Sequence, residues 1–378
     1  MKICSTPHKK TPPHRFLSQR NGVLSSLSEK PCYYAAIDLG TTSCRLLIVK
    51  NFRGKFKIIE RFSSPVLLGE GVSLTGKLDE QAIERTLETL RLFARKMAHW
   101  PISSIYAITT EVCRQAENSQ EFLERVYAET GLKIQIISDR EEAELALESC
   151  RSLLCASPAG NQPGRALIFD IGGGSTELSW VRTDSLSQRH YLAGMTSLKQ
   201  GIVSLTELFA HLAPKDAYHA AFKFIRGKLE QFEKIYCIKR EVARHNVQLI
   251  GLSGTITTIA GVALDLKRYD RYRIDGTVLS SETVAQAVAK IKTMSRSALE
   301  KHPCIGYGRS SLVLAGCAIY EAIQSMWPID YITIADRGLR DGMVMRMARN
   351  HKLRFRQEYN PKSDSSMILR SGALALSL

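Results

Sequence analysis

Apolar residues in the first half of the chain come in short continuous runs that alternate with stretches of helical spacing. The short runs predict strands at 33–39, 45–50, 56–62, 104–108 and 133–137. Apolar side chains recur every three or four residues at 79–98, 119–130 and 141–154, which predicts helices there. Asp79 is the expected N-cap of the first helix, and Gly131 the expected end of the second. Strands that lead into alternating strands and helices indicate an α/β domain.

The same kind of pattern restarts after a stretch rich in proline, glycine and small polar residues at 157–164, which we interpret as a linker. Strands are predicted at 165–171, 176–182, 247–252 and 331–334. Helices are predicted at 198–212, 215–236, 256–264, 281–294, 310–326 and 337–350. We therefore expect a first domain at 33–156, a second at 165–344, and a helix end with a basic tail at 345–378.

The restart includes a repeated local motif. Residues 36–43 read Ala-Ile-Asp-Leu-Gly-Thr-Thr-Ser, and residues 168–175 read Ile-Phe-Asp-Ile-Gly-Gly-Gly-Ser. Both are an apolar strand that contains an aspartate, a turn of glycine and small residues, and then a second strand. Asp38 and Asp170 lie 132 residues apart, which is one domain length. One copy could serve structure alone, because Asp and Gly fill many turns. Two copies favour an internal duplication of a whole domain.

Length and charge narrow the class of protein. The length of 378 residues suggests two or three domains. A composition of 44% hydrophobic and 24% charged residues excludes collagen-like, disulfide-scaffold and fully disordered chains. No apolar run reaches the roughly 18 residues of a membrane span. The net charge of +15 raises three possible partners, namely nucleic acid, anionic lipid and a polyanionic substrate.

Much of this charge lies at the two ends. Residues 1–33 and 345–378 each carry a net +5. We expect 1–32 to be a disordered basic extension, and it lacks the apolar stretch of a secretory signal. The nine cysteines are scattered and odd in number, which is typical of free thiols in a reducing compartment. A cytoplasmic location is the resulting prediction.

The duplicated turns favour phosphate chemistry. Turns of glycine, serine and threonine point several backbone N–H groups at one spot and so form an anion-binding concavity. The hydroxyl groups of Thr41, Thr42, Ser43, Ser175 and Thr176 would add donors. An aspartate beside such a turn would repel phosphate unless it holds a divalent cation or its water shell, so Asp38 and Asp170 are candidate metal ligands. Glu177 could reach the same zone, or it could be an exposed strand carboxylate.

Three further candidates lie elsewhere. Ser253-Gly254-Thr255, between a strand and a helix, is a weaker third phosphate turn. The acids of Arg140-Glu141-Glu142-Ala143-Glu144 could activate water, or they could only complement the helix dipole. Arg114 follows a strand at the end where ligands bind in open α/β sheets. Its guanidinium could bind phosphate bidentately, through two parallel N–H···O hydrogen bonds, or it could form a surface ion pair. The sequence has no Gly-x-x-x-x-Gly-Lys-Ser/Thr loop, and its histidines lack metal-ligand spacing.

At these motifs the chain resembles the exopolyphosphatase and guanosine pentaphosphate phosphohydrolase family of the actin-like ATPase superfamily. The resemblance covers residues 33–349, and blocks at 36–47, 109–125, 136–147, 167–178, 249–260 and 334–342 carry it. It implies two duplicated actin-like (ribonuclease H-like) α/β domains with the active site in the cleft between them. The block Asp-Ile-Gly-Gly-Gly-Ser-Thr-Glu at 170–177 is its most specific part.

The resemblance also implies roles for individual residues. Glu142 matches the family's general base, Asp170 and Glu177 its acids near magnesium, and Arg114 its phosphate-binding arginine. Lys228 aligns loosely with a polyphosphate-binding lysine. Thr42 replaces a common asparagine, Glu144 a common arginine, and Arg309-Ser310-Ser311 a common Arg-Ala-Asp. The sequence shows no counterpart of the additional helical domains of longer polyphosphatases, so we do not expect a long processive channel.

Taken together, we predict a Mg²⁺-dependent phosphohydrolase that releases terminal phosphate from polyphosphate or from the 5′ end of guanosine pentaphosphate. Glu142 is the predicted base, and Asp38, Asp170 and Glu177 are the predicted metal ligands. The predicted substrate-binding residues are Gly40, Thr41, Thr42, Ser43, Arg45, Arg114, Gly172, Gly173, Gly174, Ser175, Thr176, Gly254 and Thr255.

Two other classes of function stay open, an actin-like kinase or ATPase and a non-catalytic binder of polyphosphate or alarmone. The expected partner is the phosphate substrate, with neither membrane nor nucleic acid, and a homodimer is possible. The sequence does not rank polyphosphate against pentaphosphate.

Overall fold

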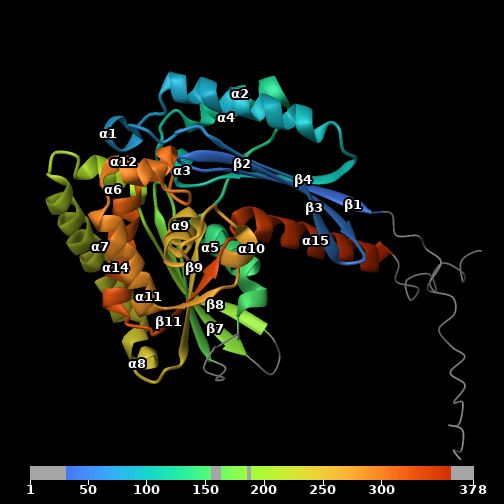
Figure 1. Ribbon diagram of the computed structural model, residues 1–378. Helices are drawn as coiled ribbons and strands as arrows, with labels where there is room; N and C mark the ends of the chain where they lie inside the picture. Colours follow the sequence, from blue (N-terminus) through green and yellow to red (C-terminus); the bar gives the residue numbers. More distant parts are fainter. Residues whose placement is uncertain (1–30, 155–162, 185–188, 359–378) are drawn as a thin grey trace, which may run out of the picture.

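The computed structural model describes residues 31–154, 163–184 and 189–358 (Figure 1). The predicted N-terminal extension up to residue 30, most of the predicted linker and the last part of the basic tail lie outside these ranges. None of the described helices is both long and apolar enough to cross a membrane.

The first sheet has five strands in the order β3-β2-β1-β4-β5. Its strands are β1 (Cys32–Leu39), β2 (Ser43–Phe52), β3 (Lys55–Pro65), β4 (Ile102–Thr109) and β5 (Gln135–Ile136). The helices of this half are α1 (Val72–Thr75), α2 (Glu80–Met97), α3 (Glu111–Gln115), α4 (Ser119–Thr130) and α5 (Asp139–Cys150), followed by the 3₁₀ turn η1 (Arg151–Leu153). Asp79 caps α2 by accepting hydrogen bonds from the backbone N–H groups of Gln81 and Ala82, and Gly131 ends α4 in the left-handed conformation, as predicted.

The second sheet has six strands in the order β10-β11-β9-β6-β7-β8. Its strands are β6 (Arg165–Ile171), β7 (Thr176–Asp184), β8 (Arg189–Leu198), β9 (Val247–Leu252), β10 (Val278–Ser280) and β11 (Tyr331–Ala335). The helices are α6 (Ile202–Leu208), α7 (Pro214–Tyr236), α8 (Ile238–Val242), α9 (Ser253–Ala263), α10 (Arg271–Ile274), α11 (Ser281–Thr293), α12 (Arg296–Lys301), α13 (Tyr307–Ser310), α14 (Val313–Met326) and α15 (Leu339–Glu358).

The repeat seen in the sequence extends to the topology. In each sheet an antiparallel meander of three strands, β1–β3 or β6–β8, is joined on the side of its first strand by parallel strands, β4 and β5 or β9 and β11. Strand β10 adds an antiparallel edge to the second sheet alone. The shared strand order supports the predicted duplication. The boundaries proposed for the two domains stay predictions.

Two sequence-based element assignments need correction. The predicted helix at 198–212 is wrong at its start, because Leu198 ends strand β8 and helix α6 covers only Ile202–Leu208. The strand was missed because polar residues such as Arg189 and Ser197 interrupt the apolar pattern of this edge strand. The strand predicted at 133–137 shortens to the two residues of β5, at the edge of the first sheet.

The elements form layers around three apolar clusters. Helices α2 and α4 cover the outer face of the first sheet (Figure 1), and α7, α9, α11 and α14 pack with the second sheet. Helices α5 and α15 lie between the two sheets. Their buried side chains, which include Leu145 and Met343, share one cluster with Ala36 of β1 and Ile168 of β6.

The two middle helices are exchanged between the halves. Helix α5 belongs by sequence to the first half but packs on β6, β7 and β8, while α15 packs on β1, β2 and β4. They meet where α15 carries Gly342. A Cβ atom at this position would lie 2.1 Å from the backbone oxygen of Leu145 in α5. Only glycine fits this contact without a backbone shift, and α5 carries the predicted base Glu142.

We expect Gly342→Ala to destabilise the protein by about 1–3 kcal/mol, since the added methyl group forces α5 and α15 apart. The matched control is Gly227→Ala in α7, where an added Cβ meets nothing within 4 Å. This change should stabilise the protein by about 0.5–1 kcal/mol. Urea unfolding of both variants measures the difference. A Gly342→Ala protein as stable as the unchanged chain would show that the helix contact is not tight.

Candidate active site

A cavity of about 310 Å³ lies where the two halves meet. Its wall includes both duplicated turns, the start of α9 and Glu142 of α5. The predicted residues that line it are Asp38, Gly40, Thr41, Thr42, Ser43, Arg45, Glu142, Asp170, Gly172, Gly173, Gly174, Ser175, Glu177, Gly254 and Thr255. Residues that are 132 positions apart in the sequence are thus brought to one site.

The two turns have the same backbone geometry and touch each other. The N–H of Gly40 donates to the oxygen of Ser43 at 3.1 Å, and the N–H of Gly172 donates to the oxygen of Ser175 at 2.9 Å. A Cβ atom added to Gly173 would lie 2.9 Å from the Cγ2 atom of Thr42. The glycines therefore let the second turn approach the first without a steric clash.

The segment after β8 holds the second turn in place. The N–H groups of Ile202 and Val203 donate to the oxygens of Gly172 and Gly173 at 3.0 and 2.8 Å. A Cβ atom on Gly201 would lie 2.4 Å from the oxygen of Gly173. The oxygens of this turn are thereby engaged, which leaves the turn to offer donors to an anion.

The strand register gives the two turns different charges. Asp38 on β1 pairs with Arg45 on β2, and Asp170 on β6 pairs with Glu177 on β7. The same place in the duplicated motif is thus a cation in one copy and an acid in the other. Arg45 donates through Nε to the hydroxyl of Ser43 at 3.0 Å, which orients its guanidinium beside the first turn.

The acids of the second turn are held in a low-dielectric environment. Burial raises the pKa of Asp170 to about 6, although a hydrogen bond from Ser253 and the charge of Arg45 oppose this shift. Burial and the charge of Asp170 raise the pKa of Glu177 to about 8. A cation bound beside these two acids would stabilise their charged forms and lower both pKa values.

The residues present fit a magnesium ion. No three of the described His, Cys, Asp and Glu side chains form a ready-made metal cage. Mg²⁺ rarely needs one, because it usually binds through one or two carboxylates, keeps several waters and takes phosphate oxygens as further ligands. Asp38, Asp170 and Glu177 offer hard oxygen donors along the cavity wall. All three therefore remain candidate ligands.

The three acids at the start of α5 have separate positions. Glu141 forms a capping box with Ser138, and Glu144 is partly exposed and pairs with Arg140. Glu142 is buried, with 7% of its surface exposed, and lines the cavity. Burial and the charge of Glu177 raise its pKa well above the usual range, and Arg114 opposes this shift. The alternative of simple helix capping therefore applies to Glu141.

Arg114 contacts the predicted base directly. Its Nη1 and Nη2 atoms donate to Oε2 of Glu142 at 3.1 and 3.0 Å. It also pairs with Glu111 at 2.9 Å and Asp139 at 2.8 Å, and donates to the oxygen of Ile137 at 2.8 Å. Arg114 therefore does form an ion pair, as one alternative predicted. This ion pair does not lie at the surface, because it lies behind the cavity and only 16% of the arginine side chain is exposed.

Two of the predicted substrate-binding residues do not line the cavity. Arg114 lies one contact behind it, beyond Glu142. Thr176 is fully buried, and its hydroxyl donates to the oxygen of Gln200 at 2.8 Å. The hydroxyl is thereby bonded inside the fold, to a residue just after β8, and is not part of the cavity wall.

The structure adds cavity residues that the sequence reasoning left out, among them Arg309 and Arg337. Arg309 donates to the hydroxyl of Thr258 at 2.7 Å and to the oxygen of Gly254 at 3.3 Å. Ser253, at the start of α9, has a φ of 77°. Left-handed backbone at a non-glycine residue often marks a functional site. The signal that could have found Arg309 was its match to the arginine of the family's Arg-Ala-Asp run, although contact with Gly254 depends on the fold.

Glu177→Gln tests the cost of burying this acid. Since the pKa of Glu177 rises from 4.5 to about 8, the folded chain keeps a proton that the unfolded chain releases, and stability falls as pH rises through this window. In EDTA we expect the variant to match the unchanged protein near pH 4.5. At pH 8.5 it should be more stable by on the order of 5 kcal/mol. Urea unfolding at both pH values measures this. A stability difference that is the same at both would contradict the electrostatic interpretation.

Known proteins share this fold. A sequence model described as the Ppx/GppA phosphatase family matches residues 47–351. A solved Ppx/GppA family member from Aquifex aeolicus is 28% identical with a TM-score of 0.70, covering 85% of this chain and 99% of that one. An exopolyphosphatase from Cytophaga hutchinsonii is 22% identical with a TM-score of 0.75, covering 84% of this chain and 98% of that one. These likenesses confirm the predicted mixed α/β fold with two sheets in an actin-like, two-domain arrangement.

Proposed function

Because the chain belongs to the Ppx/GppA phosphatase family, we propose that this phosphatase releases inorganic phosphate from polyphosphate or from the 5′ end of guanosine pentaphosphate. One observation carries the proposal. Glu142 is a buried acid in contact with Arg114, and it lines the same cavity as both glycine turns. A water activator and an anion-binding surface thus belong to one site.

In the proposed step, a water oxygen forms a bond to the terminal phosphorus while the bridging P–O bond breaks. Glu142 accepts the proton that this water loses, and the shortened substrate leaves with the bridging oxygen. Arg114 donates to Oε2 through both Nη atoms, so we assign Oε1 to the water. The N–H groups of the two turns hold the phosphate oxygens in line with this attack.

The proposed cofactor is Mg²⁺, with ligands from Asp38, Asp170 and Glu177. When bound, it would neutralise charge on the phosphate oxygens. Arg45, Arg309 and Arg337 line the same cavity. Three arginines fit a substrate that carries several negative charges, which supports a chain of phosphates. The proposed location remains the cytoplasm, and a homodimer remains possible.

Glu142→Gln should lower kcat by about 100- to 1000-fold, because it removes the proton acceptor while it keeps the size and one hydrogen-bonding oxygen of the side chain. The dissociation constant of the substrate should stay nearly unchanged. The matched control is Glu144→Gln, two residues further along the same helix, where the carboxylate is partly exposed and pairs with Arg140. This change should leave turnover unchanged. Phosphate release and calorimetric binding measure the two effects. Undiminished turnover in Glu142→Gln would rule out its role as the base.

A second experiment compares polyphosphate and guanosine pentaphosphate as substrates of the purified protein. We expect phosphate release from at least one of them, its loss in EDTA and its recovery when Mg²⁺ is added, since the cavity acids need a cation beside the substrate. Release that depends on ATP and an acceptor would instead identify a kinase. Tight, salt-sensitive binding of either compound without any release would identify a binding protein.

A further inference from the structure

We propose that Lys199 is a positioning residue of this site, which holds Arg114 in place and through it aligns Glu142. The proposal rests on the proposed function of Glu142 as the base. Lys199 follows directly after β8, in the segment that the sequence analysis assigned to a helix. It is not part of the described cavity wall, so it acts through other residues and not on the substrate.

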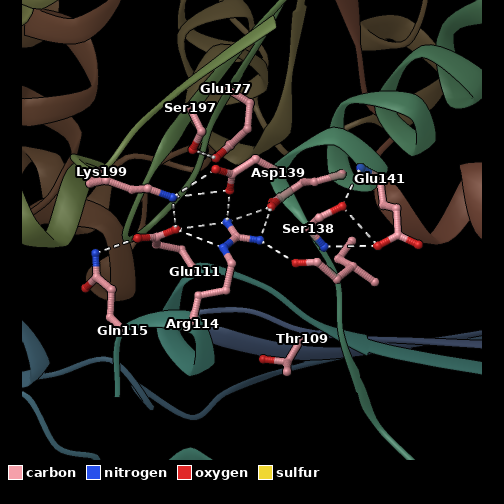
Figure 2. A network of polar contacts seen from close by, with 12 residues as sticks. Thr109, Glu111, Arg114, Gln115, Ser138, Asp139, Glu141, Glu177, Ser197 and Lys199 are labelled. Atoms are coloured by element: carbon pink, nitrogen blue, oxygen red, sulfur yellow. Dashed lines mark hydrogen bonds and ion pairs between the residues drawn. The ribbon is translucent and has the colours of Figure 1, made fainter. Parts of the chain in front are cut away.

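Lys199 and Arg114 share the same two acids (Figure 2). The Nζ atom of Lys199 donates to Oε2 of Glu111 at 2.7 Å and to the two carboxylate oxygens of Asp139 at 3.2 and 3.1 Å. Arg114 reaches the same Oε2 atom of Glu111 at 2.9 Å, and Oδ1 of Asp139 at 2.8 Å. A displacement of Lys199 therefore changes the balance of charge around Arg114.

The charge in this cluster explains why a second cation is needed. Glu111, Asp139 and Glu142 are three acids, and Glu111 has only 2% of its surface exposed. With Lys199 present, two cations share them. Without it, a single guanidinium would have to neutralise all three, and the buried Glu111 would compete with Glu142 for its N–H groups. We expect the guanidinium to turn away from Glu142, which would then lose its two hydrogen bonds.

The end of β8 connects this cluster to the proposed metal ligand. Ser197, two residues before Lys199, donates its hydroxyl proton to Oε1 of Glu177 at 3.1 Å. One short stretch of backbone thus holds a proposed metal ligand through Ser197 and the proposed base through Lys199 and Arg114. The side chains of Ser197 and Lys199 thus help to set the separation of Glu177 and Glu142. Preorganisation of catalytic groups in this way raises the rate of the chemical step.

The test compares Lys199→Met, which removes the charge, with Lys199→Arg, which keeps it. We expect Lys199→Met to lower kcat about 10- to 100-fold, as for other residues that orient a catalytic group, with little change in KM. Lys199→Arg should restore most of the rate. The control is Lys292→Met, since Lys292 is similarly exposed and pairs with Glu321 at 3.4 Å away from the cavity. This control should leave kcat unchanged.

A double-mutant cycle distinguishes positioning from a general loss of structure. If Lys199 acts through Glu142, Lys199→Met should have no further effect on the rate of a Glu142→Gln protein. Additive losses would overturn the proposal. So would an unchanged kcat in Lys199→Met, a rise in KM alone, or a Lys199→Arg protein as slow as Lys199→Met.

A crystal structure of Lys199→Met gives a readout that does not depend on activity. We expect Arg114 to shift from Glu142 toward Glu111 and Asp139, whereas an unmoved Arg114 would overturn the proposal. If the unchanged protein releases phosphate from neither substrate, the proposed function fails. The crystal structure then still decides whether Lys199 positions Arg114.

Discussion

The close crossing of α5 and α15 between the two sheets is the constraint on which the rest of the structure depends. Each helix comes from one half of the sequence and packs on the sheet of the other half. The backbone of α15 at Gly342 lies against the carbonyl of Leu145 in α5, which leaves no room for adjustment. The position of α5 then fixes Glu142 relative to the turns of both sheets, because α5 packs on one sheet while its first turn is tied to Arg114 beside the other.

The second organising principle is the balance of charge in a buried region. Acids lead from the cavity wall into the protein, from Asp170 and Glu177 to Glu142, and behind Glu142 lies Arg114 with its partners Glu111 and Asp139. Burial raises the pKa values of Asp170 and Glu177, which line the cavity. Acids behind Glu142 are neutralised by two basic side chains. The cavity wall thus carries several acids together with Arg45, Arg309 and Arg337, on the side where a cation and a phosphate substrate are proposed to bind.

Much of the fold could be predicted from the sequence because its central strands are continuous apolar runs. The strands at 165–171 and 247–252 match the structure, and both glycine turns and Glu142 line one cavity as expected. Strand β8 was missed because polar residues such as Arg189 and Ser197 interrupt its apolar pattern. The direct contact between Arg114 and Glu142 joins residues 28 positions apart, and it depends on how α3 and α5 meet. The spacing of residues along the sequence also does not show that the Thr176 hydroxyl is bonded to the oxygen of Gln200 inside the fold.

The unequal charges of the two duplicated motifs have a consequence for how such a site can arise. Arg45 in the first copy and Glu177 in the second occupy the same place opposite an aspartate. A symmetric pair of identical chains would carry the same residue on both walls, either two cations or two acids. A polar cavity with a wall for anions and a wall for cations requires that symmetry to be broken. Joining both copies in a single chain allows each to diverge at this one position while the shared strand order is kept.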